Sequence, residues 1–363
     1  MNKLCFVSAL VLAVAVSGQR RPGRQRLGII ATDIGVPPVP GGVPGTGQLA
    51  VPPGCFCIPI NQACPFRTTV RIGFRPNAER CPDMKECCNP DLTAPPPQPA
   101  PFGVCGRQNA VRKNQIIHGA ALFGEFPWMT MILDRRNRYV AGGALVSGEW
   151  VLTAAHRIQN QGPNNLIVRL GELDFSNPQD SPVFPHRDVP VDRIVVHPQF
   201  NPQTLANDIA LVHLATPVSN TLATNIGTVC LPSQGQFFKG LKCAVSGWGG
   251  DPTIPGNAFQ NVLRAVEVPI VDPFACQHRL GAARLGANFT LDQTSFVCAG
   301  GVEGNDACTG DGGSPLVCRN DNDNSWTVVG LVAWGLGCAQ REVPGVYVNV
   351  ASYVNFIRQF VRF

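Results

Sequence analysis

The sequence has few of the features that place a chain in a membrane or on a nucleic acid. Its one long apolar run, Leu4–Val16, is shorter than the roughly 18 residues that a membrane-spanning helix requires, and no later run reaches that length. The formal net charge is only +5 over 363 residues, which is too small to indicate a nucleic-acid partner. We therefore expect neither a membrane span nor a nucleic-acid partner.

The amino terminus has the pattern of a secretory signal. Lys3 precedes the apolar run, and Val16-Ser17-Gly18 supplies the small residues of a signal-peptidase site. Residues 1–18 are predicted to be a signal peptide, which would make the protein secreted and extracellular. Its removal takes Cys5 and leaves 14 of the 15 cysteines, an even number that fits complete disulfide pairing in an oxidising compartment.

Residues 19–54 and 89–115 have the composition of linkers. The first is rich in Gly, Pro and Val with almost no aromatic residues, and the second contains the proline run Ala94–Pro101. Neither can bury enough apolar surface to fold alone, and the proline run favours an extended polyproline helix. The first linker begins with a basic cluster, which we interpret as a solvated tail rather than a binder of anionic surfaces. The cluster consists of Arg20, Arg21, Arg24 and Arg26.

A cysteine-rich island, residues 55–88, lies between the two linkers. Its 34 residues are too few for a self-sufficient core, so three disulfides would have to stabilise it. Six cysteines permit 15 pairings, and the residues alone do not choose among them. A zinc site is the weaker alternative, because the cysteine spacing is poor for a metal and the island contains no histidine. The cysteines are Cys55, Cys57, Cys64, Cys81, Cys87 and Cys88.

Residues 116–363 have the pattern of an all-β domain. Short β-branched runs such as Leu166–Leu170 and Thr327–Val332 alternate with Gly, Pro and Asn. Only the segment Tyr353–Phe360 has apolar residues at helical spacing. We predict a β-barrel or sandwich that ends in a helix.

Three segments of this domain carry residues with catalytic potential. They are Trp150–His156, Asn207–Leu211 and Asp306–Cys318. Together with the opening Ile116–Gly119, they resemble the chymotrypsin-like serine proteases, in which a His, an Asp and a nucleophile loop follow in this order. The resemblance implies a double β-barrel over the whole 248-residue block.

The nucleophile loop lacks its nucleophile. A serine protease needs a hydroxyl within about 3 Å of the histidine, which an Asp orients, and backbone N–H groups that face the oxyanion. His156 and Asp208 match the first two roles, and Gly310 and Gly312 match the N–H donors, but Gly312 stands where the serine belongs. Loss of that serine costs on the order of 10⁶ in kcat. We predict an inactive homologue rather than an enzyme.

Ser314 is the one alternative nucleophile in this loop. Two residues can displace a backbone position by about 7 Å, and Ser314 takes the place of a family glycine. It would have to reach His156 and the same N–H donors from the wrong position. An active protease that uses Ser314 is therefore the least favoured alternative.

Other departures from the family point the same way. Gln115 precedes Ile116, so trypsin-like cleavage would not free the amine that pairs with Asp311 in the family. Ala141 and Arg157 stand at both positions of the disulfide that flanks the family histidine. We expect activation by cleavage and bracing of the active site to be lost along with catalysis.

The same resemblance implies a specificity pocket and a set of disulfides. Asp306 matches the acidic base of a trypsin-like pocket, with Gly335 and Gly345 in its walls; the pocket either still accepts Arg or Lys or has collapsed. Asn288-Phe289-Thr290 is a glycosylation sequon. The implied disulfides of this domain are Cys105–Cys230, Cys243–Cys318, Cys276–Cys298 and Cys308–Cys338.

The six-cysteine island, the proline-rich linker and the protease domain without its serine together resemble the arthropod clip-domain serine protease homologues. The similar subgroups are the prophenoloxidase-activating factors and the masquerade-like proteins. The resemblance makes residues 55–88 a clip domain and implies the pairs Cys55–Cys87, Cys57–Cys81 and Cys64–Cys88.

This family resemblance also implies a function. It implies a cofactor or scaffold in innate immunity, with prophenoloxidase and its activating proteases as partners and melanisation as the outcome, and it calls for no cofactor and no metal. A secreted pattern-recognition, antimicrobial or adhesion protein that binds microbial surfaces is the second alternative. An activating nick is expected between the third and fourth island cysteines, after one of Arg67, Arg71, Arg75 and Arg80.

Overall fold

The structure is a computed structural model, and it describes the following residues: 56–59, 85–88, 104–109, 117–176, 185–218, 225–238, 241–250, 259–303, 311–320, 323–337 and 340–362. The predicted signal peptide, the first linker and most of the island and second linker lie outside these residues. Within the island, strands β1 (Phe56–Pro59) and β2 (Lys85–Cys88) pair antiparallel, with Cys57 opposite Cys87 in the backbone register. The three clip disulfides stay predictions.

The first barrel is a closed ring of six antiparallel strands in the order β4-β5-β6-β9-β8-β7. Pairing of β4 with β7 closes the ring. Buried and exposed side chains alternate along its strands: in β8, Val189 and Val191 are buried while Asp188, Pro190 and Asp192 are exposed. Each fully buried Val or Leu contributes about 1.5–3 kcal/mol. The strands are β4 (Met129–Asp134), β5 (Tyr139–Leu145), β6 (Trp150–Thr153), β7 (Leu166–Leu170), β8 (Arg187–Val196) and β9 (Ala210–Leu214).

The second barrel follows the order β10-β13-β14-β15-β12-β11, and pairing of β11 with β10 closes it. A short additional strand, β3 (His118–Ala120), pairs with the outer edge of β11. The barrel strands are β10 (Lys242–Gly247), β11 (Arg264–Val271), β12 (Phe296–Gly300), β13 (Pro315–Arg319), β14 (Trp326–Trp334) and β15 (Pro344–Asn349).

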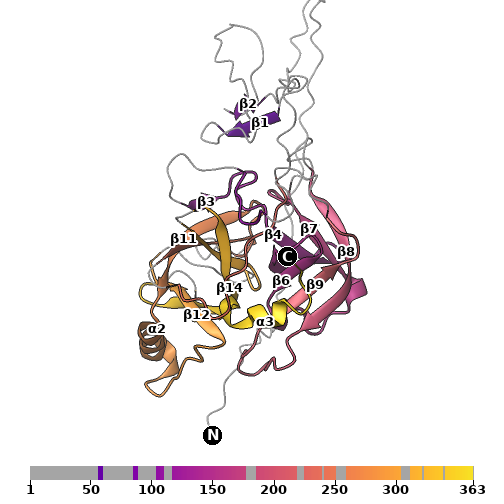
Figure 1. Cartoon of the computed structure of the whole chain (residues 1–363). Helices are drawn as coiled ribbons and strands as arrows, with labels where there is room; N and C mark the ends of the chain where they lie inside the picture. Colours follow the sequence, from indigo (N-terminus) through magenta and orange to yellow (C-terminus); the bar gives the residue numbers. More distant parts are fainter. Residues whose placement is uncertain are drawn as a thin grey trace, which may run out of the picture. The chain divides into compact units, whose positions relative to one another are not determined.

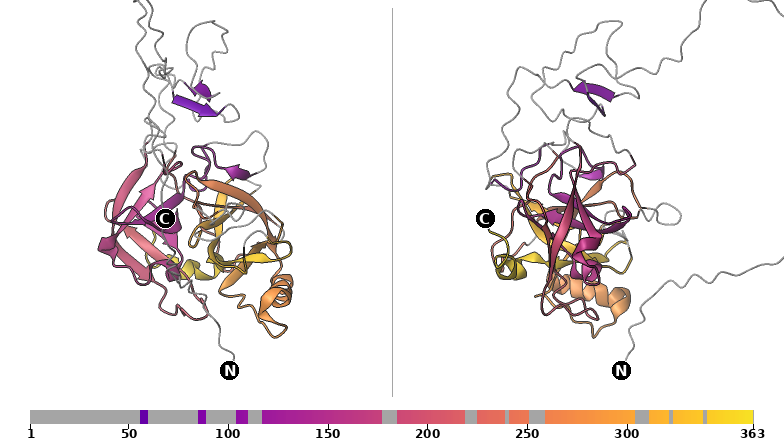
Figure 2. Two further views of the ribbon diagram at one scale, coloured as in Figure 1. Left: turned by 180° about the vertical axis from the view of Figure 1, so that it is seen from behind. Right: turned by 90° about the vertical axis from the view of Figure 1, so that its right-hand side faces the viewer.

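The two barrels pack against each other. Met131 and Leu211 of the first barrel belong to the same buried apolar cluster as Val317 and Leu331 of the second. Figure 1 shows the magenta strands of the first barrel beside the orange and yellow strands of the second, and the left view of Figure 2 shows the same arrangement from behind. Together with the family resemblance, this packing gives the all-β, chymotrypsin-like double barrel that the motifs predicted.

Few helices accompany the strands. Helix α1 (Ala155–Ile158) follows β6, and helix α2 (Pro273–Leu280) begins at Asp272, whose carboxylate accepts the backbone N–H groups of Phe274 and Ala275. A π-helical turn, Gly281–Leu285, extends α2, and 3₁₀ turns span Pro163–Asn165 and Val350–Tyr353.

The carboxyl-terminal helix is shorter than the predicted segment Tyr353–Phe360. Helix α3 covers Val354–Ile357 and is followed by a turn. Beyond Arg358 the N–H groups of Gln359 and Phe360 bond three residues back rather than four, which tightens the last turn out of α-geometry.

Candidate functional site

The barrels bring three sequence-distant segments to one place. His156 lies on α1, Asp208 lies two residues before β9, and Gly312 lies three residues before β13. His156 and Asp208 have the arrangement of the histidine and aspartate in a serine-protease triad. The glycine faces that histidine.

His156 and Asp208 form a tightly coupled pair. The imidazole Nδ1 of His156 lies 2.7 Å from Oδ2 of Asp208, and the backbone N–H of His156 donates to Oδ1 of the same carboxylate at 2.7 Å. Burial raises the pKa of Asp208, while the hydrogen bond and charge of His156 oppose this rise. Asp208 can therefore still orient His156 as a base, with Nε2 of the imidazole directed away from the aspartate.

A second set of contacts, which the motifs did not reveal, fixes the segment before Asp208. The hydroxyl of Tyr353 lies 3.2 Å from Oδ1 of Asn207 and 3.2 Å from Oγ of Ser295, and the N–H of Asn207 donates to that Ser295 oxygen. Asn207 has a positive φ of 56°, a conformation that asparagine tolerates better than most residues. The second barrel thus positions the aspartate of the first.

Gly313 docks the nucleophile loop against the first barrel. Its φ is +86°, and a Cβ at this position would come within 2.6 Å of the carbonyl oxygen of Gly142 and would also strike the Thr153 hydroxyl. Only glycine fits such a position. The N–H of Gly142 in turn donates to the Gly312 carbonyl at 3.2 Å, so the loop lies directly on β5.

Gly312 faces the imidazole without a side chain. A Cβ at Gly312 would lie 3.2 Å from Nε2 of His156, and 3.0 Å from Cδ of Arg157. A side chain at this position would thus begin at the base, where a nucleophile must be held. The glycine leaves that position without a reactive atom.

Arg157 ties together the two segments that a disulfide joins in the family. Its Nε donates to the carbonyl oxygen of Val140 at 2.8 Å, and its Nη2 donates to the same oxygen. Val140 precedes Ala141, so the contact joins α1 to β5 at the positions where both expected cysteines are absent. The brace is replaced rather than lost, which corrects the expectation from the sequence.

Ser314 lies on the inner side of the loop. It is completely buried, and its hydroxyl occupies the space that the absent side chain of Gly142 leaves open. Nearby, Asp311 accepts the N–H of Gly249 at 2.8 Å. Burial raises the pKa of the Tyr139 hydroxyl far above its usual value, and the negative charge of Asp311 adds to this rise.

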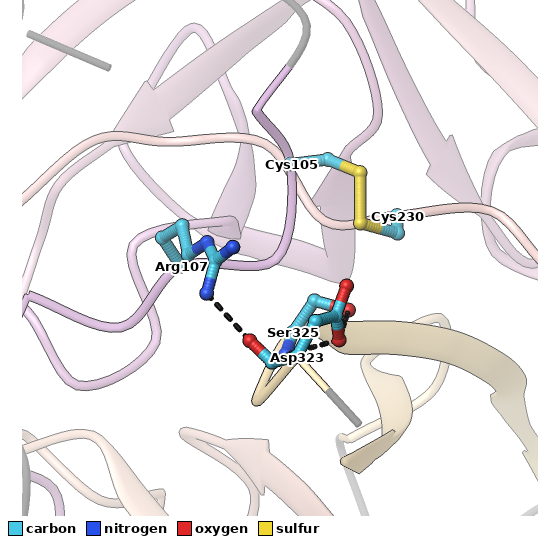
Figure 3. Close-up of a disulfide and its surroundings, with 5 residues drawn as sticks. All are labelled: Cys105, Arg107, Cys230, Asp323 and Ser325. Atoms are coloured by element: carbon cyan, nitrogen blue, oxygen red, sulfur yellow. Dashed lines mark hydrogen bonds between the residues drawn. A yellow bond between two sulfur atoms is a disulfide. The ribbon is translucent and has the colours of Figure 1, made fainter. Parts of the chain in front are cut away.

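Three disulfides are present among the described residues: Cys105–Cys230, Cys243–Cys318 and Cys276–Cys298. The first anchors the segment that precedes the barrels. The N–H of Gly106 donates to the Thr228 carbonyl, and the Gly106 carbonyl accepts from the N–H of Trp326. Nη1 of Arg107 donates to the Asp323 carbonyl at 2.7 Å (Figure 3). The family resemblance implies the same three pairs.

The remaining predicted site residues divide into two groups. Gly335 follows β14 and Gly345 lies in β15, and Asn288 of the sequon is exposed. Ile116, Gln115, Asp306, Gly310 and the cysteines Cys308 and Cys338 lie outside the described residues, as do the four island arginines. The Asp306 pocket and the oxyanion donors therefore stay predictions.

Among the described residues, no helix is long and apolar enough to cross a membrane. In the same residues, no group of three or more His, Cys, Asp or Glu side chains has the arrangement of a metal site.

Comparison with known proteins gives consistent matches. The trypsin family model matches residues 117–357. "Inactive CLIP domain-containing serine protease A3" of Aedes aegypti is 46% identical over 67% of the chain, a match that spans half of that relative. "Phenoloxidase-activating factor 2" of Galleria mellonella is 39% identical over 76% of the chain and 95% of that relative. "Inactive CLIP domain-containing serine protease A8" of Anopheles gambiae is 34% identical over 88% of the chain and 92% of that relative.

Proposed function

Because the chain belongs to the clip-domain serine protease homologues of the trypsin family, we propose that it is a non-catalytic cofactor or scaffold in an extracellular immune protease cascade. The cascade we propose is the one that activates prophenoloxidase and ends in melanisation. Its partners would be prophenoloxidase and the proteases that activate it. The name of the Galleria relative supports this cascade, and the predicted signal peptide supports secretion.

The observation that carries the non-catalytic role is the geometry at Gly312. The position that faces Nε2 of His156 holds no hydroxyl, although the His156–Asp208 pair beside it is intact. A base without a nucleophile cannot form the covalent acyl intermediate that this chemistry requires. Two relatives whose names contain the word inactive agree with this role.

Ser314 gains no support as a substitute nucleophile. Its hydroxyl is fully buried on the side of the loop that faces Gly142, away from the solvent that a substrate would enter from. Labelling with a fluorophosphonate tests this point. We expect no adduct on the wild-type chain, and a Ser314-dependent adduct would restore the protease alternative.

The microbial-surface alternative rests on the basic cluster of the first linker. That cluster, Arg20 to Arg26, lies outside the described residues. Deletion of residues 19–54 tests it: binding to microbial surfaces that survives the deletion would exclude the cluster as its cause.

The Asp306 pocket belongs to the same proposal. We propose that Asp306, with Gly335 and Gly345 in the walls, still accepts a basic side chain of a partner without cleaving it. Isothermal titration calorimetry with benzamidine tests this, because benzamidine carries the same planar cation. Absence of binding heat would indicate a collapsed pocket.

The proposed function itself is tested by reconstituting prophenoloxidase activation with an activating protease, in the presence and absence of this protein. We expect the protein to increase phenoloxidase activity while cleaving nothing itself. An unchanged yield of phenoloxidase activity would contradict the cofactor role, and cleavage of prophenoloxidase by the protein alone would contradict the non-catalytic role.

A further inference from the structure

The side chain of Arg157 passes beside the position that a Gly312 side chain would occupy. Its Cδ and Cγ lie 3.0 Å and 3.3 Å from the place where a Gly312 Cβ would stand. The relative exposure of Arg157 is intermediate, and its guanidinium is held at the Val140 carbonyl in a partly buried hydrogen bond. A fixed cation therefore belongs to the residue whose stem lies against Gly312.

The guanidinium has two edges for hydrogen bonding, and only one has a partner in the part of the chain that the structure describes. Nε and Nη2 share the edge that binds the Val140 carbonyl. Nη1 and Nη2 share the other edge, which has the fork geometry that matches a carboxylate. Among the described residues, no acidic side chain forms an ion pair with Arg157. Its anchored edge holds the group in place, so little side-chain entropy is lost when the other edge binds a ligand.

His156 flanks the same position from the other side. Its Nε2 lies 3.2 Å from the place of the Gly312 Cβ, and its Nδ1 is engaged by Asp208. Nε2 of His156 and Cδ of Arg157 thus both lie within 3.2 Å of one point.

An exposed aromatic side chain contacts the strand that anchors Arg157. The ring centroid of Phe259 lies 5.9 Å from that of Tyr139, and Phe259 is 58% exposed. Tyr139 directly precedes Val140, the anchor of Arg157. An exposed apolar side chain therefore packs on the residue that precedes the anchor of Arg157.

We propose that the position vacated at Gly312 is a carboxylate-binding site for an extended segment of a partner protein. An Asp or Glu side chain of that segment binds the free edge of Arg157 beside His156, and an apolar neighbour packs on Phe259. The site excludes a basic side chain here, because Arg157 would repel it. This inference rests on the proposed cofactor function and names the surface that would serve it.

Blocked dipeptides test the site on the intact, full-length protein. The probes are acetyl-Asp-Leu-amide and its neutral match acetyl-Asn-Leu-amide, and the readout is the NMR signal of the His156 ring protons. We expect the Asp peptide to bind about 10-fold more tightly than the Asn peptide, with millimolar affinity that weakens in salt.

Variants separate the site from non-specific attraction. Arg157→Gln is expected to abolish the preference for the Asp peptide, and Arg157→Lys to weaken it, because lysine keeps the charge but lacks the fork. Arg358→Gln, which removes an exposed arginine at the carboxyl-terminal cap of α3, far along the sequence, should leave the preference unchanged. Thermal melts of each variant show that it is folded, and Arg157→Lys stands in if Arg157→Gln does not fold.

Two results overturn the inference. One is that the Asp and Asn peptides bind equally well, or not at all, at peptide concentrations up to about 10 mM. The other is a preference for the Asp peptide that persists in Arg157→Gln, because the peptide would then bind residues other than Arg157. Failure here is distinct from failure of the cofactor role: a wild-type protein that promotes prophenoloxidase activation without preferring the Asp peptide refutes only the carboxylate site.

Discussion

Strands β4 to β9 form a barrel without a single cysteine, whereas the second barrel contains Cys243–Cys318 and Cys276–Cys298 and is joined through Cys230 to Cys105. In the first barrel, polar contacts stand where cross-links could be. Arg157 binds Val140 across the site of the absent disulfide. Arg169 on β7 binds Glu172, which follows that strand, and Asp188 on β8. The comparison teaches that loss of the cysteines beside His156 left a barrel that depends on side-chain charge, which a ligand can also engage.

The largest effect is expected from removing a cross-link of the second barrel. Replacing Cys243 and Cys318 with alanine should lower the free energy of unfolding by about 2–5 kcal/mol, because the loop they close spans 75 residues. Chemical denaturation measures the loss. Hydrogen exchange should show weakened protection in β10 and β13 with β6 and β9 unaffected; equal weakening in both barrels would contradict their separate stabilisation.

Breaking the ion network of the first barrel should cost less. Glu172 is buried, and its Oε2 lies 3.3 Å from Nη1 of Arg169 and 3.2 Å from Nδ1 of His186. Glu172→Gln keeps the shape but removes the charge, and should cost about 2 kcal/mol, since Arg169 keeps Asp188. Denaturation in low and high salt measures this, with exposed Glu149→Gln as the control. A loss that disappears in high salt would show the network to be screened rather than buried.

Removing the brace should cost about 1.5 kcal/mol. Arg157→Met keeps the aliphatic stem over Gly312 but removes both hydrogen bonds to the Val140 carbonyl. Denaturation midpoints of this variant and of Arg358→Met give the comparison. Equal stability of the two variants would mean that the contact to Val140 does not brace the first barrel.

The smallest expected effect is a dependence on pH. His197 packs against Tyr353 and Phe356 with ring centroids 5.3 Å and 4.8 Å away, and burial lowers the pKa of its imidazole below 6.5. Below that value the unfolded chain takes up a proton before the folded one does, so stability is lost as the pH falls through the lowered pKa. Unfolding measured across this range should show a steeper fall for wild type than for His197→Phe, and parallel curves would contradict the assignment.

The short β-branched runs predicted an all-β barrel or sandwich, and the ordered motifs, through the family resemblance that they carry, implied the double barrel and the approach of His156 to Asp208. Both signals are short patterns that can be found in a linear chain. The brace could not be found that way. An arginine in place of a cysteine indicates a lost disulfide, and only folding reveals that its guanidinium reaches the carbonyl of Val140.

Other features depended on contacts between distant segments. The Tyr353 hydroxyl reaches Asn207 from 146 residues away, and no local pattern announces such a partner. The same holds for the burial of Ser314, whose hydroxyl fills the space beside Gly142, although the sequence alone already makes Ser314 the least favoured nucleophile. The predicted carboxyl-terminal helix was too long because the helical spacing of apolar residues continues into a turn. In that turn the N–H groups bond three residues back instead of four.

The anchored segment around Cys105 also has a mechanical consequence. Its disulfide, the backbone bonds of Gly106 and the contact of Arg107 with Asp323 all act next to the start of β14. A pulling force applied to the chain before Cys105 would therefore be transmitted to Trp326 at the start of β14, and so to the second, cross-linked barrel.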